Sequence, residues 1–315
     1  MTFFIARVIP SDPAAKWVGG RATAEQKAAA VVELGLDKPL YVQYYRYVTD
    51  LCRGNLGRSL NSKRNVTEEL AVYLPATFEL VFIAFFFAVA IGIPLGIYSA
   101  KQNGKLLDHV TRFFSIGAVS LPTFWISLIL QLVFYKMLRL LPLGGRISTN
   151  ASIFYDIPNI TGLLLLDTAI TGEWALFGDA LRHIILPSVT ISLYPIGLVT
   201  RMTRSALLEI LDEDYIVAAR SYGIMERRVL WSYALKNSLG ATATVVALSM
   251  GYTLVDTFLA ETVFSWPGLG SYVAKSVVTL DHPAIIGIAL VSAFFYVVLN
   301  LLADIIIALD PRVKL

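Results

Sequence analysis

Long apolar stretches without a single charged residue dominate the pattern along this chain. Four of them are long enough for a helix to cross the hydrocarbon core of a membrane, which takes about 20 apolar residues. They lie at residues 80–100, 113–135, 237–255 and 283–303. A fifth, at 184–200, is shorter and contains Pro187 and Pro195, which a helix bundle tolerates because neighbouring groups satisfy the carbonyls that proline frees. The pattern predicts five membrane-spanning helices.

The segment before the first long window divides into two parts. Residues 1–9 are apolar, but at ~1.5 Å per residue a helix of this length reaches only about 14 Å, so we expect the remnant of a truncated first membrane helix. Residues 10–79 are expected to form an external region and 80–315 the transmembrane core. Within the external region, residues 24–34 have the pattern of one amphipathic helix that Gly35 stops.

Basic residues in the short connections predict the orientation in the membrane. The connections at 101–112 and 201–237, together with the residues after 311, carry eleven Lys or Arg, whereas those at 136–182 and 256–282 carry five. Cytoplasmic connections are the richer in Lys and Arg. We therefore expect the 201–237 segment and the C-terminus to lie in the cytoplasm of a bacterium or archaeon, with the chain in its plasma (inner) membrane.

Composition excludes several classes of protein. The 315 residues are 56% hydrophobic and 16% charged, whereas soluble domains are about 45–50% apolar and about 25% charged. A soluble enzyme therefore does not fit. One cysteine and three scattered histidines offer no disulfide and no zinc pattern, and a net charge of +3 is too small to indicate a nucleic-acid partner. We therefore expect the chain to be surrounded by membrane lipid.

The segment at 205–237 has the pattern of a helix with one break. Acidic residues ending at Asp214 suit a helix start, and Gly223 interrupts the apolar spacing that follows. The small side chains of Ala218 and Ala219 leave room for another protein to approach. The pattern predicts a docking element of two short helices, although a helical hairpin that docks on nothing has the same pattern.

Ten short strings, in this order along nearly the whole chain, resemble one family of membrane proteins. They are PSDP at 10–13, LGLDKPL at 34–40, GNLGRSL at 54–60, LPATFEL at 74–80, IPLG at 93–96, SLPTFW at 120–125, DYIVAARSYG at 214–223, ERRVLWSYALKN at 226–237, FSWPGLG at 264–270 and DPR at 310–312. The family is the B-type permease of dipeptide, oligopeptide and nickel ABC importers, and the 214–223 string is similar to its EAA loop.

This resemblance implies an all-α polytopic membrane protein, the transmembrane domain of a type I ABC importer with five full spans plus a truncated first span. It implies a second permease subunit, one or two ATP-binding subunits and an external substrate-binding protein as partners. It also implies that the 205–237 loop docks on the ATPase. The residues carried over for docking are Asp214, Tyr215, Ala218, Ala219, Arg220, Gly223, Glu226, Arg227 and Arg228. The three arginines either contact the ATPase or anchor the chain at the membrane surface.

The chain itself offers no nucleotide site. Residues 270–276 read GSYVAKS, with Ala274 where a phosphate-binding loop needs glycine before the lysine. We therefore expect neither cofactor nor metal nor enzymatic activity in this chain, and ATP and Mg²⁺ are expected in separate ATPase subunits.

Charged residues in or beside the apolar windows are candidates for function because burying them in a membrane is costly. Asp256 is the best placed, either facing the translocation pathway or bonding to a neighbouring helix. Glu261 is a weaker candidate, and Glu79 and Asp304 lie at window edges where interfacial water can reach them.

Peptides are the leading cargo, but nickel, glutathione and oligosaccharide importers share these motifs. Two other classes compete with an importer of this family. A transporter driven by an ion gradient would show broken helices and paired carboxylates at membrane depth. A membrane enzyme would show a cluster of catalytic or metal-binding residues there.

Overall fold

The computed structural model describes residues 13–19 and 22–308. Over these ranges the chain is helical, with one isolated β-bridge between Arg58 and Asn65. The expected remnant at 1–9 lies outside the described residues. In chain order the helices are α2 (Pro13–Val18), α3 (Ala24–Glu33), α4 (Leu40–Cys52), α5 (Val66–Lys101), α6 (Leu106–Ser120), α7 (Thr123–Leu130), the π-helix η1 (Gln131–Met137), α8 (Thr149–Phe154), α9 (Leu164–Thr171), α10 (Trp174–Leu211), α11 (Asp214–Ser221), α12 (Glu226–Arg228), the π-helix η2 (Val229–Ala234), α13 (Leu235–Val263), α14 (Leu269–Val278) and α15 (His282–Ala308).

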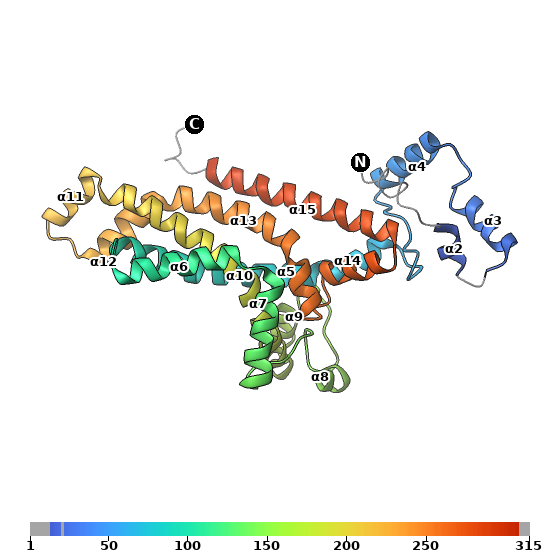
Figure 1. Ribbon diagram of the computed structural model, residues 1–315, viewed down its shortest axis with the longest axis horizontal. Coiled ribbons are helices and arrows are strands. Elements are labelled where there is room, and N and C mark those ends of the chain that lie inside the picture. Colours follow the sequence, from blue (N-terminus) through green and yellow to red (C-terminus); the bar gives the residue numbers. More distant parts are fainter. Residues whose placement is uncertain (1–12, 20–21, 309–315) are drawn as a thin grey trace.

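Five long helices form an elongated bundle. Figure 1 shows α5, α6, α10, α13 and α15 running along the long axis, with α11 and α12 at one end and α2, α3 and α4 at the other. Helix α10 packs along α5, α6 and α13, and α13 packs on α15. Among the described residues, three helices are long and apolar enough to cross a membrane, and two bent pairs raise the number to as many as five. The five apolar windows fall on these five units.

The second apolar window does not form one continuous span. Helices α6 and α7 are bent by 108° at the break between them, and in Figure 1 α7 leaves the bundle beside α8 and α9. Pro122 explains the break, because proline has no amide hydrogen and disfavours a helical conformation at the residue before it. Leu121 accordingly has the extended ψ of 135°. The expectation of a single helix over 113–135 is therefore wrong.

Helix α5 extends beyond the apolar window at 80–100. It begins at Val66 and contains Pro75 and Pro94. The apolar window leaves out the first turns of α5 because they carry Glu68 and Glu69. Val66 and other residues of this stretch are nevertheless buried against α14 and α15. Tertiary packing therefore sets the start of the helix, and the division between residues 79 and 80 falls inside α5.

Two glycines allow α5 to approach α10 closely. A Cβ atom at Gly96 would lie 2.6 Å from the Cβ of Thr203, and one at Gly92 would lie 2.9 Å from a methyl carbon of Val199. No larger residue fits at either position without moving a helix, which is the usual role of small residues between membrane helices.

Candidate functional site

Two short helices form a hairpin between the ends of α10 and α13. Helix α11 begins after Glu213, whose backbone is extended, and ends at Ser221. Gly223 has a φ of +74°, a left-handed conformation that side chains other than glycine rarely adopt. The chain then enters α12 and η2, which lead into α13. The two helices and the break at Gly223 that the pattern predicts are confirmed.

The hairpin is joined to the bundle by a small apolar core. Side chains from α5, α10, α11 and η2 meet there away from solvent. The core consists of Ile97, Ala100, Leu207, Ile216, Ala219, Val229, Leu230 and Ala234. Because protein cores are packed like crystals and transmit strain, a force on the hairpin reaches the ends of α5 and α10 directly.

Most of the residues predicted to dock lie on the surface of this hairpin. Asp214, Ala218, Arg227 and Arg228 are exposed. Ala219 is different, because it is 5% exposed and belongs to the apolar core beneath. Its small side chain serves packing within the hairpin.

Two polar contacts lie at the hairpin, one across its turn and one between α11 and α13. Arg220 and Glu226 form an exposed ion pair of 3.0 Å across the turn at Gly223. The side-chain amide of Asn237 donates a hydrogen bond of 2.8 Å to the hydroxyl of Tyr215. Arg220, Glu226 and Tyr215 therefore make contacts within this chain, in addition to any contact with another protein.

Three large apolar side chains of the hairpin are exposed. Val217 is 53%, Tyr222 86% and Met225 73% exposed. Sequence reasoning did not select these three together as a surface, because the helical pattern alone does not reveal which face the core covers. Exposed apolar side chains on such a short hairpin are candidates for contact with another protein. We call these three residues the hairpin tip.

A buried ion pair ties a third helix to α10 near the hairpin. Arg204 on α10 contacts both carboxylate oxygens of Asp108 on α6, through Nε at 2.6 Å and Nη2 at 2.8 Å. Ser99 on α5 donates a further hydrogen bond of 2.7 Å to Asp108, which is fully buried. Two-point contacts of this kind are strong and directional. Sequence reasoning missed this pair because its members are far apart in the chain.

Two of the sequence strings meet near the other end of the bundle. Glu261 is fully buried and accepts hydrogen bonds from the hydroxyl of Thr77, at 2.7 Å, and from the amide of Gly270, at 2.5 Å. The hydroxyl of Thr77 in turn accepts from the amide of Leu269 at 2.7 Å. Thr77 belongs to LPATFEL and the two amides to FSWPGLG. The start of α14 is thereby fixed to α5.

The loop between η1 and α8 packs on the same strings. The indole of Trp266 donates a hydrogen bond of 2.9 Å to the carbonyl of Ala76, and the amide of Gly145 donates one of 2.8 Å to the carbonyl of Phe264. A Cβ atom at Gly144 would lie 2.1 Å from that carbonyl oxygen. We call this assembly around Glu261 and Trp266 the α14 lock.

Glu79 belongs to this region as well, and its expected position is corrected. It is 5% exposed, not open to interfacial water. Arg146 forms an ion pair with it at 2.5 Å, and the amide of Leu165 donates a hydrogen bond of 2.6 Å to it. A partner more than sixty residues away in the chain satisfies the charge, which no local pattern reveals.

A third contact joins α14 to the start of α5. The ring of Tyr272 stacks on that of Tyr73 with centroids 4.8 Å apart, and its hydroxyl donates a hydrogen bond to Glu69. Burial raises the pKa of Tyr272 well above its usual range, and the hydrogen bond to Glu69 acts in the same direction. The phenol therefore stays protonated and keeps this contact at any physiological pH.

Asp256 lies where the two bent spans touch. Its carboxylate accepts a hydrogen bond of 3.1 Å from the hydroxyl of Thr123, the first residue of α7. The segment Asp256–Val263 is bent by 53° from the preceding part of α13. Of the two expectations for Asp256, the bond to a neighbouring helix is present, and the residue is partly exposed.

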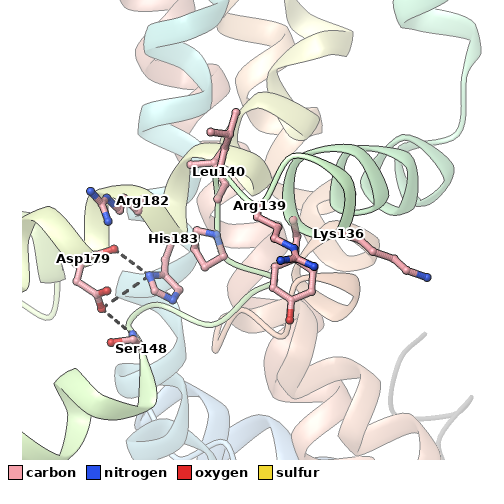
Figure 2. Close-up of a pocket in the computed structure, with 10 residues that line it drawn as sticks. Lys136, Arg139, Leu140, Ser148, Asp179, Arg182 and His183 are labelled. Carbon is pink, nitrogen blue, oxygen red and sulfur yellow. Dashed lines mark hydrogen bonds and ion pairs between the residues drawn. The ribbon is translucent and has the colours of Figure 1, made fainter.

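A cavity of about 600 Å³ lies beside η1 and the first half of α10. In it, Asp179 accepts a hydrogen bond of 2.6 Å from the amide of Ser148, and Nδ1 of His183 lies 2.8 Å from the backbone carbonyl of Asp179. Lys136 points away from this group in Figure 2. The described residues also contain no group of three His, Cys, Asp or Glu that could hold a metal ion.

Comparison with known proteins places the whole arrangement in a family. The sequence profile of the family described as "Binding-protein-dependent transport system inner membrane component" matches residues 92–315. This range includes the hairpin and all of the α14 lock except its residues on α5. The chain belongs to this family. A second profile, for the N-terminal part of such membrane components, matches residues 1–81. The chain is thus a membrane component of a binding-protein-dependent transport system.

Relatives of this family member align over almost their full length. This chain is 44% identical to the probable D,D-dipeptide transport system permease protein DdpB of Escherichia coli (strain K12), and the alignment covers 99% of this chain and 92% of the relative. It is 39% identical to the di/tripeptide transport system permease protein DppB of Pseudomonas aeruginosa and 38% identical to the dipeptide transport system permease protein DppB of Alkalihalophilus pseudofirmus, each covering 100% of this chain and 93% of the relative.

The fold also matches a solved transporter. A structure of the MetNI methionine ABC transporter in inward-facing conformations superposes with a TM-score of 0.54 at 13% identity, covering 74% of this chain and 92% of the other. At this identity the likeness concerns the fold, which is the transmembrane domain of an ABC importer.

Proposed function

We propose that this permease forms half of the translocation pathway of an ATP-driven importer of di- or oligopeptides, paired with a second permease subunit. An external substrate-binding protein delivers the cargo. Support for peptides comes from the relatives, whose names specify D,D-dipeptide, di/tripeptide and dipeptide transport. Nickel, glutathione and oligosaccharides are the cargoes against which peptides must be tested.

The chain has no ATPase site of its own in this proposal. One or two kinds of ATP-binding subunit bind ATP and Mg²⁺, and they dock on the hairpin in the cytoplasm, where the C-terminus also lies. One observation carries the proposal: the hairpin presents the apolar tip of Val217, Tyr222 and Met225 while its base is packed into the ends of α5 and α10. In this proposal, closure of the ATPase dimer moves the hairpin, and the hairpin moves the ends of α5 and α10 with it.

Substitution at the hairpin tip tests the docking. The complete importer carrying Tyr222→Arg should lose at least tenfold in affinity between permease and ATPase subunits and lose ATP-driven uptake, because a charge replaces an apolar contact. Tyr41→Arg on α4 is the matched control, since Tyr41 is 75% exposed but distant from the hairpin. Equal affinities for the wild type and Tyr222→Arg would refute docking at the tip.

An ion-gradient-driven transporter is the second candidate, because bent spans meeting at a carboxylate are features of that class. Proteoliposomes distinguish the two mechanisms. Uptake that needs internal ATP and survives a protonophore supports the importer. Uptake that needs no ATPase subunits and stops with the protonophore supports the ion-driven mechanism.

A further inference from the structure

Two tyrosine rings and one carboxylate lie on a shared face of α10 and α13. The rings of Tyr194 and Tyr252 are tilted by 32° with centroids 5.3 Å apart, and Asp256 follows one helical turn after Tyr252. Tyr252 is 51% exposed. Tyr194 lies within the apolar window at 184–200, and Tyr252 lies near the end of the window at 237–255, with Asp256 just beyond it.

The carboxylate of Asp256 is only partly satisfied within the chain. Oδ2 accepts the hydrogen bond from Thr123, whereas Oδ1 has no donor among the described residues. Arg201 and Asp256 both lie within electrostatic range of Tyr194, but no ion pair forms between them. Among the described residues, Asp256 therefore forms no ion pair, and its side chain stays partly exposed.

The rest of α13 indicates what this face meets. The hydroxyl-bearing residues Ser249, Thr253 and Thr257 are buried, and their hydroxyls donate to carbonyls of their own helix. The face that is open to the surroundings instead carries Tyr252, which is exposed, and Asp256, which is partly exposed. A charged residue inside a membrane faces a water-filled cavity or the interior of an assembly, because contact with lipid is too costly. This face is therefore expected to meet water or another subunit, and not lipid.

A carboxylate beside aromatic rings is the chemistry that binds an ammonium group. The carboxylate accepts charge-assisted hydrogen bonds, and the faces of tyrosine rings attract cations. We propose that Asp256, Tyr252 and Tyr194 form a binding position for the N-terminal ammonium group of a peptide in transit. The identity of the cargo rests on the proposed function, but the cation preference of the position does not.

Charged thiol reagents test the cation preference without any cargo. The variant Tyr252→Cys is made in a Cys52→Ser background, because Cys52 is an exposed free thiol, and is assembled into the complete importer. Cationic methanethiosulfonate ethyltrimethylammonium should modify Cys at 252 at least fivefold faster, relative to its rate on a free thiol, than anionic methanethiosulfonate ethylsulfonate. Adding Asp256→Asn should abolish this preference. Equal normalised rates before that substitution, or no modification in any state of the ATP cycle, would overturn the proposal.

Uptake of alanyl-alanine by the complete importer tests the consequence for transport. Asp256→Asn keeps an acceptor for Thr123 but removes the charge, so we expect at least a tenfold lower maximal uptake rate, with Asp256→Glu close to the wild type. Thr123→Val, which removes the hydrogen bond alone, should have the smaller effect. If Thr123→Val and Asp256→Asn are equally impaired, Asp256 is a structural acceptor and the inference fails. If the wild type transports no peptide, the proposed cargo fails, while the reagent experiment still decides the cation preference.

Discussion

The hairpin and the α14 lock of this permease are held together by different kinds of contact. At the hairpin, a core of small and medium apolar side chains holds two short helices whose polar contacts, such as Arg220 with Glu226, lie in solvent. At the α14 lock, carboxylates are buried and each is held by several donors, as Glu261 is by Thr77 and Gly270. Solvent-exposed pairs contribute little to stability, whereas a buried charge that loses its partner is costly.

This difference indicates which end moves. The hairpin can be displaced as a unit because its exposed contacts are replaceable by water or by a partner. The lock cannot open without leaving buried charges and amides unsatisfied, so it fixes α14 to α5 and keeps that end rigid. We therefore expect substitutions in the lock to affect stability most and substitutions in the hairpin to affect coupling most.

The largest effect is expected for Arg146→Ala, which leaves Glu79 buried without its partner. We expect the free energy of unfolding to fall by about 3 kcal/mol, measured by thermal unfolding of the purified complex in detergent. Arg182→Ala is the control, because Arg182 is exposed and should change the value by less than about 0.5 kcal/mol. Similar losses in both variants would show that burial of Glu79 does not depend on its pair with Arg146.

A slightly smaller effect is expected for Gly144→Ala. The added Cβ atom would lie 2.1 Å from the carbonyl oxygen of Phe264, so the loop must move, at a cost of about 2 kcal/mol. Gly178→Ala is the matched control, because that glycine is helical with no atom within 4 Å of the added carbon. Alanine there should be neutral or more stable by up to about 1 kcal/mol. Thermal unfolding of both variants gives the comparison, and a stable Gly144→Ala would show that the loop is not fixed.

At the hairpin, Gly223→Ala should cost about 1 kcal/mol, because φ is +74° there while no atom lies near the added carbon. If the strain changes the angle between the two short helices, affinity for the ATPase subunits falls about fivefold, which calorimetry or pull-down titration measures. Gly223→Asn should retain most of the affinity, since asparagine tolerates this conformation. Equal losses for alanine and asparagine would point to the missing flexibility of glycine instead of its φ.

The smallest effect is expected for Glu226→Gln. The ion pair with Arg220 has both side chains about 40% exposed, so its removal should cost at most about 0.5 kcal/mol and less at high salt. Thermal unfolding at low and high ionic strength measures this. A loss above about 2 kcal/mol would mean that the hairpin depends on polar contacts as the lock does.

Much of the fold could be predicted from the sequence because its signals are local. A membrane span needs a continuous apolar stretch, and all five windows fall on long helices or bent pairs. The hairpin could be predicted for the same reason, since the break at Gly223 and the acidic start at Asp214 are properties of neighbouring residues. Leu121 and Pro122 also carried the signal for the bend of 108°, but an apolar window averages over a single proline.

Hydrophobicity and backbone preference act over a few residues, so the amino-acid sequence alone predicts a membrane protein, the positions of its spans and the turn of its hairpin. Which residues of these elements contact one another depends on how the helices pack. This packing buries Ala219, pairs Glu79 with Arg146 and brings Thr123 to Asp256. These contacts join residues far apart in the chain, so they form only when the helices pack, and local sequence preferences do not predict them.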